Sequence, residues 1–251
     1  MVLLRRRARE RWRALALVTA LLAPLAELTN ARAGGVLVPP RWVQRSPTSS
    51  GSLRASWEAL LFAQLEEGDR RWLPRAQRLP DGRTRYSYRR RQGEPPLTLP
   101  QIQELIRNPP RFTAERRAIT ALLERLRILG VQVDLKPAGR PSAAGEWDPA
   151  RATVRIRPDV AALGSRDFAR VLNHEAIHVA QSCRGGGVRR NPVPLGLSRR
   201  LTTENAALLA QPPYQRIPAR ARQLEEEAFA HQDDLSMGLT LLARLCRPAA
   251  T

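Results

Sequence analysis

The chain has 251 residues, which is enough for one domain with extensions or two small domains, and its composition is neither fibrous nor disordered. Its formal net charge is +19, yet its 42 basic residues include a single lysine, Lys136. Arginine is spread over the whole chain, which indicates a compositional preference rather than a surface built for an anionic partner. No specific nucleic-acid partner is therefore expected.

Residues 1–33 have the composition of a secretory signal peptide. A basic start is followed by an uncharged run, Ala14–Ala26, and by a small-x-small ending at Ala33. This predicts export through the secretory pathway, to the periplasm, a lumen or the extracellular space. The alternative is an uncleaved N-terminal membrane anchor, but thirteen residues interrupted by Pro24 are shorter than the roughly 18 to 20 that span a bilayer.

Residues 34–112 are predicted to be an Arg/Pro-rich N-terminal extension with short helices. Apolar residues at helical spacing indicate one helix over 56–67, and the segment 99–110 indicates another that ends at its prolines. Between them, Tyr86 and Tyr88 lie among arginines, a pattern typical of a solvated loop and, less often, of a clamp for single-stranded nucleic acid.

Residues 113–251 are predicted to form an α+β domain. Apolar residues at helical spacing predict a helix from Thr113 that Gly130 ends, and 131–136 alternates as a strand does. A hairpin is predicted over residues 146–157, with a turn at Asp148 and Pro149. A further helix is predicted from Ser165, as its cap, to about Gly185.

The segment 173–183 reads NHEAIHVAQSC and holds two of the three histidines in the chain. Residues four apart lie on the same face of a helix, so His174 and His178 can direct two imidazoles at one zinc ion. Glu175 lies close enough to accept a proton from a water on that zinc and to pass it to a leaving group. Because histidine is so scarce here, the HExxH spacing predicts a metal site and hydrolytic chemistry.

A third zinc ligand has to come from elsewhere in the chain. The metzincin signature would place a histidine at position 184, which is Arg184, so this class is excluded. The acidic, helix-like segment 223–234 begins 45 residues after His178, and a carboxylate from it would complete a catalytic set of two histidines and one glutamate. One zinc per chain is expected.

The HExxH helix followed by the EEEA run at 225–228 resembles the gluzincin branch of the zincin metallopeptidases. The resemblance implies that Glu225 is the third ligand, with Glu227 as the alternative, and that Glu175 is the general base. Gluzincins often carry an aspartate four residues after the ligand, whereas this chain has Phe229 or His231 there. His231 is therefore a candidate for a catalytic role, or for the third ligand if neither glutamate binds.

The resemblance also implies a zincin-like core, in which the edge strand of a small sheet precedes the HExxH helix and pairs with an extended peptide substrate. In this chain that strand would be 152–157, with Arg155 and Arg157 on its open face as substrate-binding residues that favour acidic side chains. Solvated arginines on a sheet edge are the alternative. Tyr214 and His231 are candidates to polarise the scissile carbonyl.

The sequence thus predicts an exported zinc metallopeptidase acting on a peptide or protein. Two other functions stay open: a non-catalytic zincin-like binding protein, and a basic adaptor that binds nucleic acid or an anionic envelope polymer through residues 34–112. Cys183 and Cys246 are expected either to form a disulfide or to be buried thiols. The oligomeric state is left open.

Overall fold

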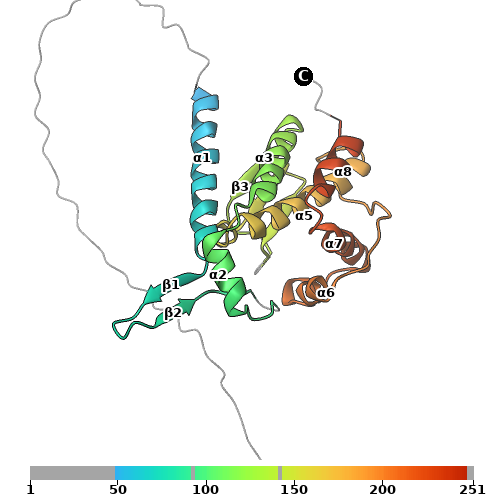
Figure 1. Cartoon of the computed structure of the whole chain (residues 1–251). Helices are drawn as coiled ribbons and strands as arrows, with labels where there is room; N and C mark the ends of the chain where they lie inside the picture. Colours follow the sequence, from blue (N-terminus) through green and yellow to red (C-terminus); the bar gives the residue numbers. More distant parts are fainter. Residues whose placement is uncertain (1–48, 92–93, 141–142, 248–251) are drawn as a thin grey trace, which may run out of the picture. The chain divides into compact units, whose positions relative to one another are not determined.

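A computed structural model describes residues 49–91, 94–140 and 143–247 (Figure 1), so the predicted signal peptide lies outside the described residues. The elements in chain order are α1 (Ser49–Arg70), β1 (Arg75–Arg78), β2 (Thr84–Ser87), α2 (Leu99–Arg107), α3 (Thr113–Ile128), β3 (Gln132–Leu135), β4 (Gly145–Asp148), β5 (Thr153–Ile156), α4 (Pro158–Ala162), α5 (Ser165–Arg184), α6 (Thr203–Leu209), the short 3-10 helix η1 (Pro212–Tyr214), α7 (Ala219–His231) and α8 (Met237–Leu245). The predicted α+β class is confirmed. None of the helices in these ranges is both long and apolar enough to cross a bilayer.

The strand before helix α5 is not an edge strand. The larger sheet has the order β3-β5-β4, in which β5 is parallel to β3 and antiparallel to β4. Val154 and Ile156 of β5 are buried, as their alternation predicts, but β4 occupies the edge. The prediction that residues 152–157 form the edge was wrong because alternation identifies a strand without identifying its neighbours.

The core surrounds α5, which passes between α3 and α8 (Figure 1). Side chains of α5 are buried from Phe168 to Cys183 on nearly every side of the helix. A helix that is enclosed in this way needs apolar neighbours all round. They come from the sheet and the helices, chiefly Ile119, Leu122 and Leu126 of α3, Val154 and Ile156 of β5, Ala228 of α7, and Leu241 and Leu242 of α8.

The core also extends into the segment predicted as an N-terminal extension. The helix predicted at 56–67 lies inside α1, and Leu61 and Leu65 on this helix are almost completely buried in the common core. The described part of α1 therefore belongs to the same packed unit as residues 113–247.

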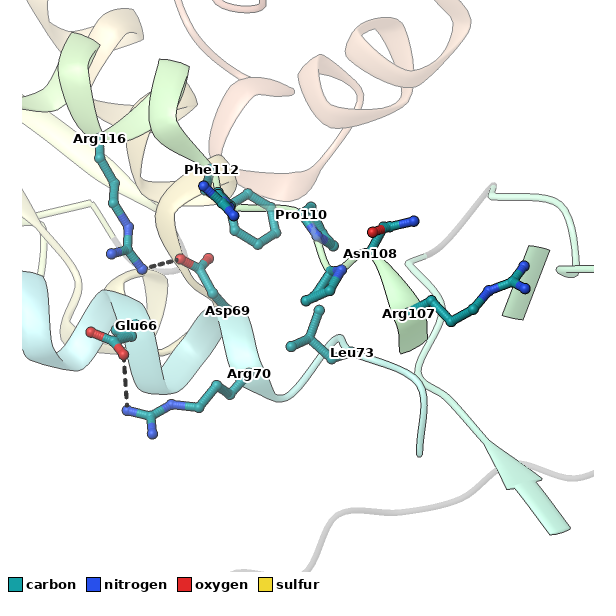
Figure 2. A pocket seen from close by; sticks show the side chains of 11 residues that line it. Glu66, Asp69, Arg70, Leu73, Arg107, Asn108, Pro110, Phe112 and Arg116 are labelled. Carbon is teal, nitrogen blue, oxygen red and sulfur yellow. Dashed lines mark hydrogen bonds and ion pairs between the residues drawn. The ribbon is translucent and has the colours of Figure 1, made fainter. Parts of the chain in front are cut away.

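The C-terminal end of α1 caps α5. The Asp69 carboxylate accepts hydrogen bonds from the backbone N and the Oγ of Ser165, both at 2.7 Å, and from Arg116 at 3.0 Å. Asp69 and Arg116, which Figure 2 shows joined by an ion pair, line a cavity. The volume of this cavity is about 520 Å³. Ser165 was predicted as the cap, but Gly164 holds the cap position, with φ of 100°, and the capping side chain comes from α1.

A disulfide joins Cys183, at the end of α5, to Cys246, directly after α8. It encloses a loop with a sequence separation of 63 residues, which contains α6, α7 and α8. Closing a loop of this length lowers the conformational entropy of the unfolded chain. This effect alone stabilises the folded state by about 4 kcal/mol. Of the two states that the sequence left open for these cysteines, the structure has the disulfide.

Candidate metal centre and active site

His174 and His178 lie one turn apart on α5, and Glu225 reaches them from α7. The Nε2 atoms of the two histidines are 3.1 Å apart, and Oε2 of Glu225 lies 3.3 Å from His174 Nε2 and 3.4 Å from His178 Nε2. All three residues are buried. Asn173 holds α7 in place, because its side-chain amide donates to the backbone oxygens of three residues at the end of this helix, His231, Gln232 and Asp234.

This spacing fits a tetrahedral zinc site. Ligand atoms at 2.0 to 2.1 Å from a zinc ion and at tetrahedral angles are about 3.3 Å from one another. The three atoms form a triangle with sides close to that length. A buried group of two histidines and one carboxylate is thus able to hold a metal ion, and it leaves a fourth position open.

The far nitrogens of both imidazoles face amide oxygens. His174 Nδ1 lies 3.2 Å from Oε1 of Gln232, and His178 Nδ1 lies 2.7 Å from Oε1 of Gln181. Each amide nitrogen donates elsewhere, from Gln232 to Asn205 and from Gln181 to Glu227, which fixes how the amides are turned. Both Nδ1 atoms therefore carry the proton, and both Nε2 lone pairs face the metal position.

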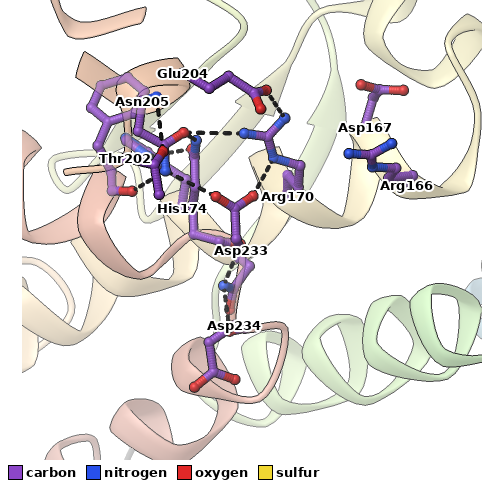
Figure 3. A network of polar contacts seen from close by, with 12 residues as sticks. Arg166, Asp167, Arg170, His174, Thr202, Glu204, Asn205, Asp233 and Asp234 are labelled. Atoms are coloured by element: carbon purple, nitrogen blue, oxygen red, sulfur yellow. Dashed lines mark hydrogen bonds and ion pairs between the residues drawn. The ribbon is translucent and has the colours of Figure 1, made fainter. Parts of the chain in front are cut away.

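A polar network that includes Arg170, Asn205 and Asp233 (Figure 3) holds Gln232 in place behind His174. The side chain of Asn205 on α6 accepts from Gln232 and from Arg170 and donates to the backbone oxygen of Phe229 and to Asp233. Arg170 also pairs with Asp233 at 2.6 Å and with Glu204 at 2.9 Å. Each member is held by several partners, so the imidazole of His174 has little freedom to turn.

Three acceptor atoms that point at one spot attract a cation. Burial alone would lower the pKa of His178, but the negative charges of Glu225 and Glu175 outweigh it and raise this pKa to about 9. Burial opposes ionisation of Glu225, yet the charge of His178 and hydrogen bonds from both histidines hold its pKa well below the usual range. Without a metal, the site keeps a proton on His178.

Arg140 holds the other oxygen of the Glu225 carboxylate. Its guanidinium lies 3.0 Å from Oε1, so Oε2 is left to face the histidines. This ion pair would leave Oε2 of Glu225 available to a metal ion. Arg140 lies in the loop between β3 and β4, about 35 residues before the HExxH segment, where no motif marks it.

Glu175 is buried beside the two histidines, and its Oε2 has no hydrogen-bond partner among the described residues. Burial raises the pKa of this carboxyl above its ordinary value, although the charges of His174 and His178 oppose the shift. The other oxygen lies against β4, since a Cβ on Gly145 would come within 2.6 Å of Glu175 Oε1. The result is a carboxyl group that can exchange a proton close to the metal position.

A cavity of about 230 Å³ opens beside this centre and is lined by His174, Glu175 and Tyr214 among others. Tyr214 in η1 packs edge-on against Phe229, and the Arg140 guanidinium lies 5.7 Å from its ring centre. Burial and the charges of Glu225 and Glu175 raise the pKa of Tyr214, so its hydroxyl stays protonated. The remaining walls are largely apolar and include Val160, Leu163, Val171 and Leu208.

Glu227 and His231 lie outside the metal-binding group of the described residues. The Glu227 carboxylate is buried and accepts hydrogen bonds from three consecutive backbone nitrogens, those of Leu195, Gly196 and Leu197, at 2.7 to 3.1 Å. It anchors the loop after α5. His231 Nε2 faces the backbone oxygen of Ser198 at 3.1 Å. Among the candidates for the third ligand, the geometry favours Glu225.

Arg155 and Arg157 are engaged with acidic side chains of their own chain. Arg155 pairs with Glu146 at 3.1 Å and with Asp148 at 3.0 Å, both on the neighbouring strand β4. Arg157 pairs with Asp159 at 2.7 Å and also lines the 230 Å³ cavity. These bonds partly neutralise both arginines, and Arg155 is not among the residues that line the cavity.

Comparison with known proteins adds no relative to these observations: no family model, no curated protein and no solved structure matches the chain.

Proposed function

We propose that this protein is an exported zinc-dependent peptide-bond hydrolase, similar to the gluzincins in its HExxH helix and downstream glutamate. The observation that carries the proposal is the triangle of His174, His178 and Glu225 around one point, next to the buried Glu175, whose Oε2 lacks a partner among the described residues. A structural metal site has no use for an additional carboxyl group with raised pKa, whereas hydrolysis requires one.

A zinc ion bound there would polarise the scissile carbonyl and lower the pKa of a water molecule beside it. Glu175 would accept the proton of the attacking water and later deliver it to the leaving amine, a task that its raised pKa suits. The protonated hydroxyl of Tyr214 would donate a hydrogen bond to the carbonyl oxygen as negative charge develops there.

A polypeptide substrate suits the surroundings of this centre. β4 is an edge strand, and its Gly145 lies against Glu175, so an extended chain paired with β4 would pass the proton-accepting carboxyl. The apolar walls of the 230 Å³ cavity would take a side chain next to the scissile bond.

The proposal is tested by comparing wild type with Glu175→Gln, His174→Ala and the control Glu226→Gln, a partly exposed glutamate on α7 that pairs with Arg199. Zinc is measured by elemental analysis, and cleavage is measured with a fluorescently labelled unfolded protein. We expect about one zinc per chain in wild type, Glu175→Gln and the control. Cleavage should fall by about 100-fold or more in Glu175→Gln and stay at the wild-type rate in the control.

His174→Ala should lose both zinc and cleavage, because two ligands hold the metal far more weakly than three. Folded wild-type protein without zinc would contradict the metal site. Zinc-loaded Glu175→Gln that cleaves as fast as wild type would contradict the hydrolase, while the metal site would stand.

A further inference from the structure

The hairpin of β1 and β2 contributes little to the core and is exposed on both faces. All eight strand residues are exposed except Tyr86, which is half-buried. The two strands form a sheet of their own, so each has one edge that no described strand covers. Isolated two-stranded hairpins are marginal in water, and an ordered one that buries so little is suited to contact with a partner.

The hairpin and the segment after it are strongly basic. Five arginines have no ion pair or side-chain hydrogen bond within the described ranges 49–91, 94–140 and 143–247: Arg75, Arg78, Arg85, Arg89 and Arg90. The one acidic residue of the hairpin, Asp81, is already paired with Arg83. A cluster of guanidinium groups without counter-charges is poised to bind anions.

The base of the hairpin holds a cavity of about 260 Å³ that is lined by three arginines and by no acidic residue. Arg71 comes from the turn after α1, Arg75 begins β1, and Arg89 follows β2. Arg71 has one long contact, with Glu67 at 3.8 Å. This concave, basic site is of a size to take carboxylate or phosphate groups.

The hairpin base is connected to the rim of the candidate active site. Arg91, two residues after Arg89, forms an ion pair with Asp167 on α5 at 2.8 Å and stacks on the ring of Trp72 at 4.1 Å. Asp167 in turn lines the 230 Å³ cavity beside His174 and Glu175. A chain that leaves this cavity across Asp167 would therefore meet the base of the hairpin.

We propose that the β1–β2 hairpin and the basic cavity at its base are an exosite that binds an acidic segment of the polypeptide substrate. The inference rests on the proposed function, and it names a substrate class: proteins with a run of Asp or Glu beyond the cleaved bond. Guanidinium groups bind carboxylates, and the open strand edges offer backbone pairing to an extended chain.

Other occupants fit less well. Tyr86 and Tyr88 are both half-buried, and their hydroxyls contact Gln103 and the backbone nitrogen of Leu97, so neither ring is fully open for stacking on bases. The strands carry no large apolar side chain to enter a bilayer. Residues 1–48 and a second copy are themselves basic, and they lack charge complementarity.

The test measures binding separately from cleavage, with zinc-loaded Glu175→Gln protein and a labelled peptide of about ten glutamates that ends in neutral residues. Two triple variants are compared in this background. One removes the arginines of the cavity, Arg71→Ala, Arg75→Ala and Arg89→Ala. The matched control removes three exposed arginines elsewhere, Arg184→Ala, Arg216→Ala and Arg220→Ala, and has the same net charge.

We expect the cavity variant to bind the peptide about tenfold more weakly or worse, and the control to bind like its parent. Thermal unfolding checks that both variants are folded. The exosite would be overturned if the zinc-loaded Glu175→Gln protein did not bind the peptide. It would also be overturned if both triple variants lost the same amount of affinity for the peptide. Tighter binding of duplex DNA or of anionic phosphatidylglycerol vesicles than of the acidic peptide would overturn it as well.

The two proposals fail separately. Binding of the acidic peptide through the cavity arginines, in a protein whose wild type cleaves nothing, would remove the hydrolase and leave an anion-binding surface. Cleavage of unfolded protein with no such binding would keep the hydrolase and remove the exosite.

Discussion

Two buried glutamates lie two residues apart on α7 and contact different partners. Glu225 faces the histidines, whereas Glu227 points to the loop after α5 and accepts three backbone hydrogen bonds. Residues two apart on a helix project from nearly opposite sides, so one carboxylate can bind a metal while the other anchors a loop.

Glu225→Gln and Glu227→Gln should therefore have different effects. Glu225→Gln is expected to weaken zinc binding by about 100-fold, because a charged ligand becomes neutral. Glu227→Gln is expected to keep about one zinc per chain and to lower the free energy of unfolding by about 1 to 3 kcal/mol, because three partly buried backbone donors lose a charged acceptor. Zinc titration with a competing chelator and urea unfolding measure the two effects. Zinc loss in Glu227→Gln alone would reverse the assignment.

At the scale of elements, the contact between α5 and β4 sets the position of the Glu175 carboxyl. A Cβ added at Gly145 would lie 2.6 Å from Glu175 Oε1 and 2.8 Å from Val171 Cγ1. There is no room for it unless α5 and β4 move apart or Glu175 turns away. Glycine at this position lets the helix approach the strand closely.

Gly145→Ala should lower kcat by about tenfold or more and leave the zinc content unchanged, because it displaces Glu175 without touching a ligand. Gly139→Ala is the matched control, since the nearest atoms to its Cβ would be the carboxylate end of the partly buried Glu146, at 3.1 Å and beyond, and we expect wild-type cleavage from it. Steady-state cleavage and elemental analysis measure both quantities. Wild-type kcat in Gly145→Ala would show that the close approach is not needed.

At the scale of the whole molecule, the metal centre couples stability to pH. In the metal-free protein the pKa of His178 is raised from 6.5 to about 9, so the folded state gains stability from this proton below pH 6.5 and loses it as pH rises through 9. The loss corresponds to about 3 kcal/mol at most. A zinc ion bound at this site would take the place of the proton and would remove this dependence of stability on pH.

We therefore expect metal-free protein to be less stable at pH 9 than at pH 6.5, and zinc-loaded protein to change much less over this range. Urea unfolding at the two pH values, with a chelator or with zinc, measures the difference. If the free energy of unfolding changed equally with pH in the metal-free and the zinc-loaded protein, His178 would not be the group that holds the proton. The variant Glu225→Gln should weaken the dependence, because the carboxylate raises the pKa of His178.

The elements that were predicted correctly are those whose residue spacing within a single segment identifies them. Apolar spacing indicated α3 and α5, alternation indicated β5, and scarcity of histidine singled out His174 and His178. The order of the strands was not predictable in this way, because pairing joins segments whose patterns do not depend on each other. For the same reason α1 was predicted to belong to an N-terminal extension: its packing against the core depends on contacts with segments far along the chain.

The sequence by itself determined the HExxH helix, the two candidate histidine ligands and the adjacent carboxyl, since all of them follow from spacing on one helix. Only the tertiary structure selected Glu225 over Glu227 and joined Cys183 to Cys246. It also brought Arg140, Gln181 and Gln232 to the metal centre. The physical reason is distance along the chain: these contacts form when separate elements pack, and packing is decided by the whole core rather than by any local pattern.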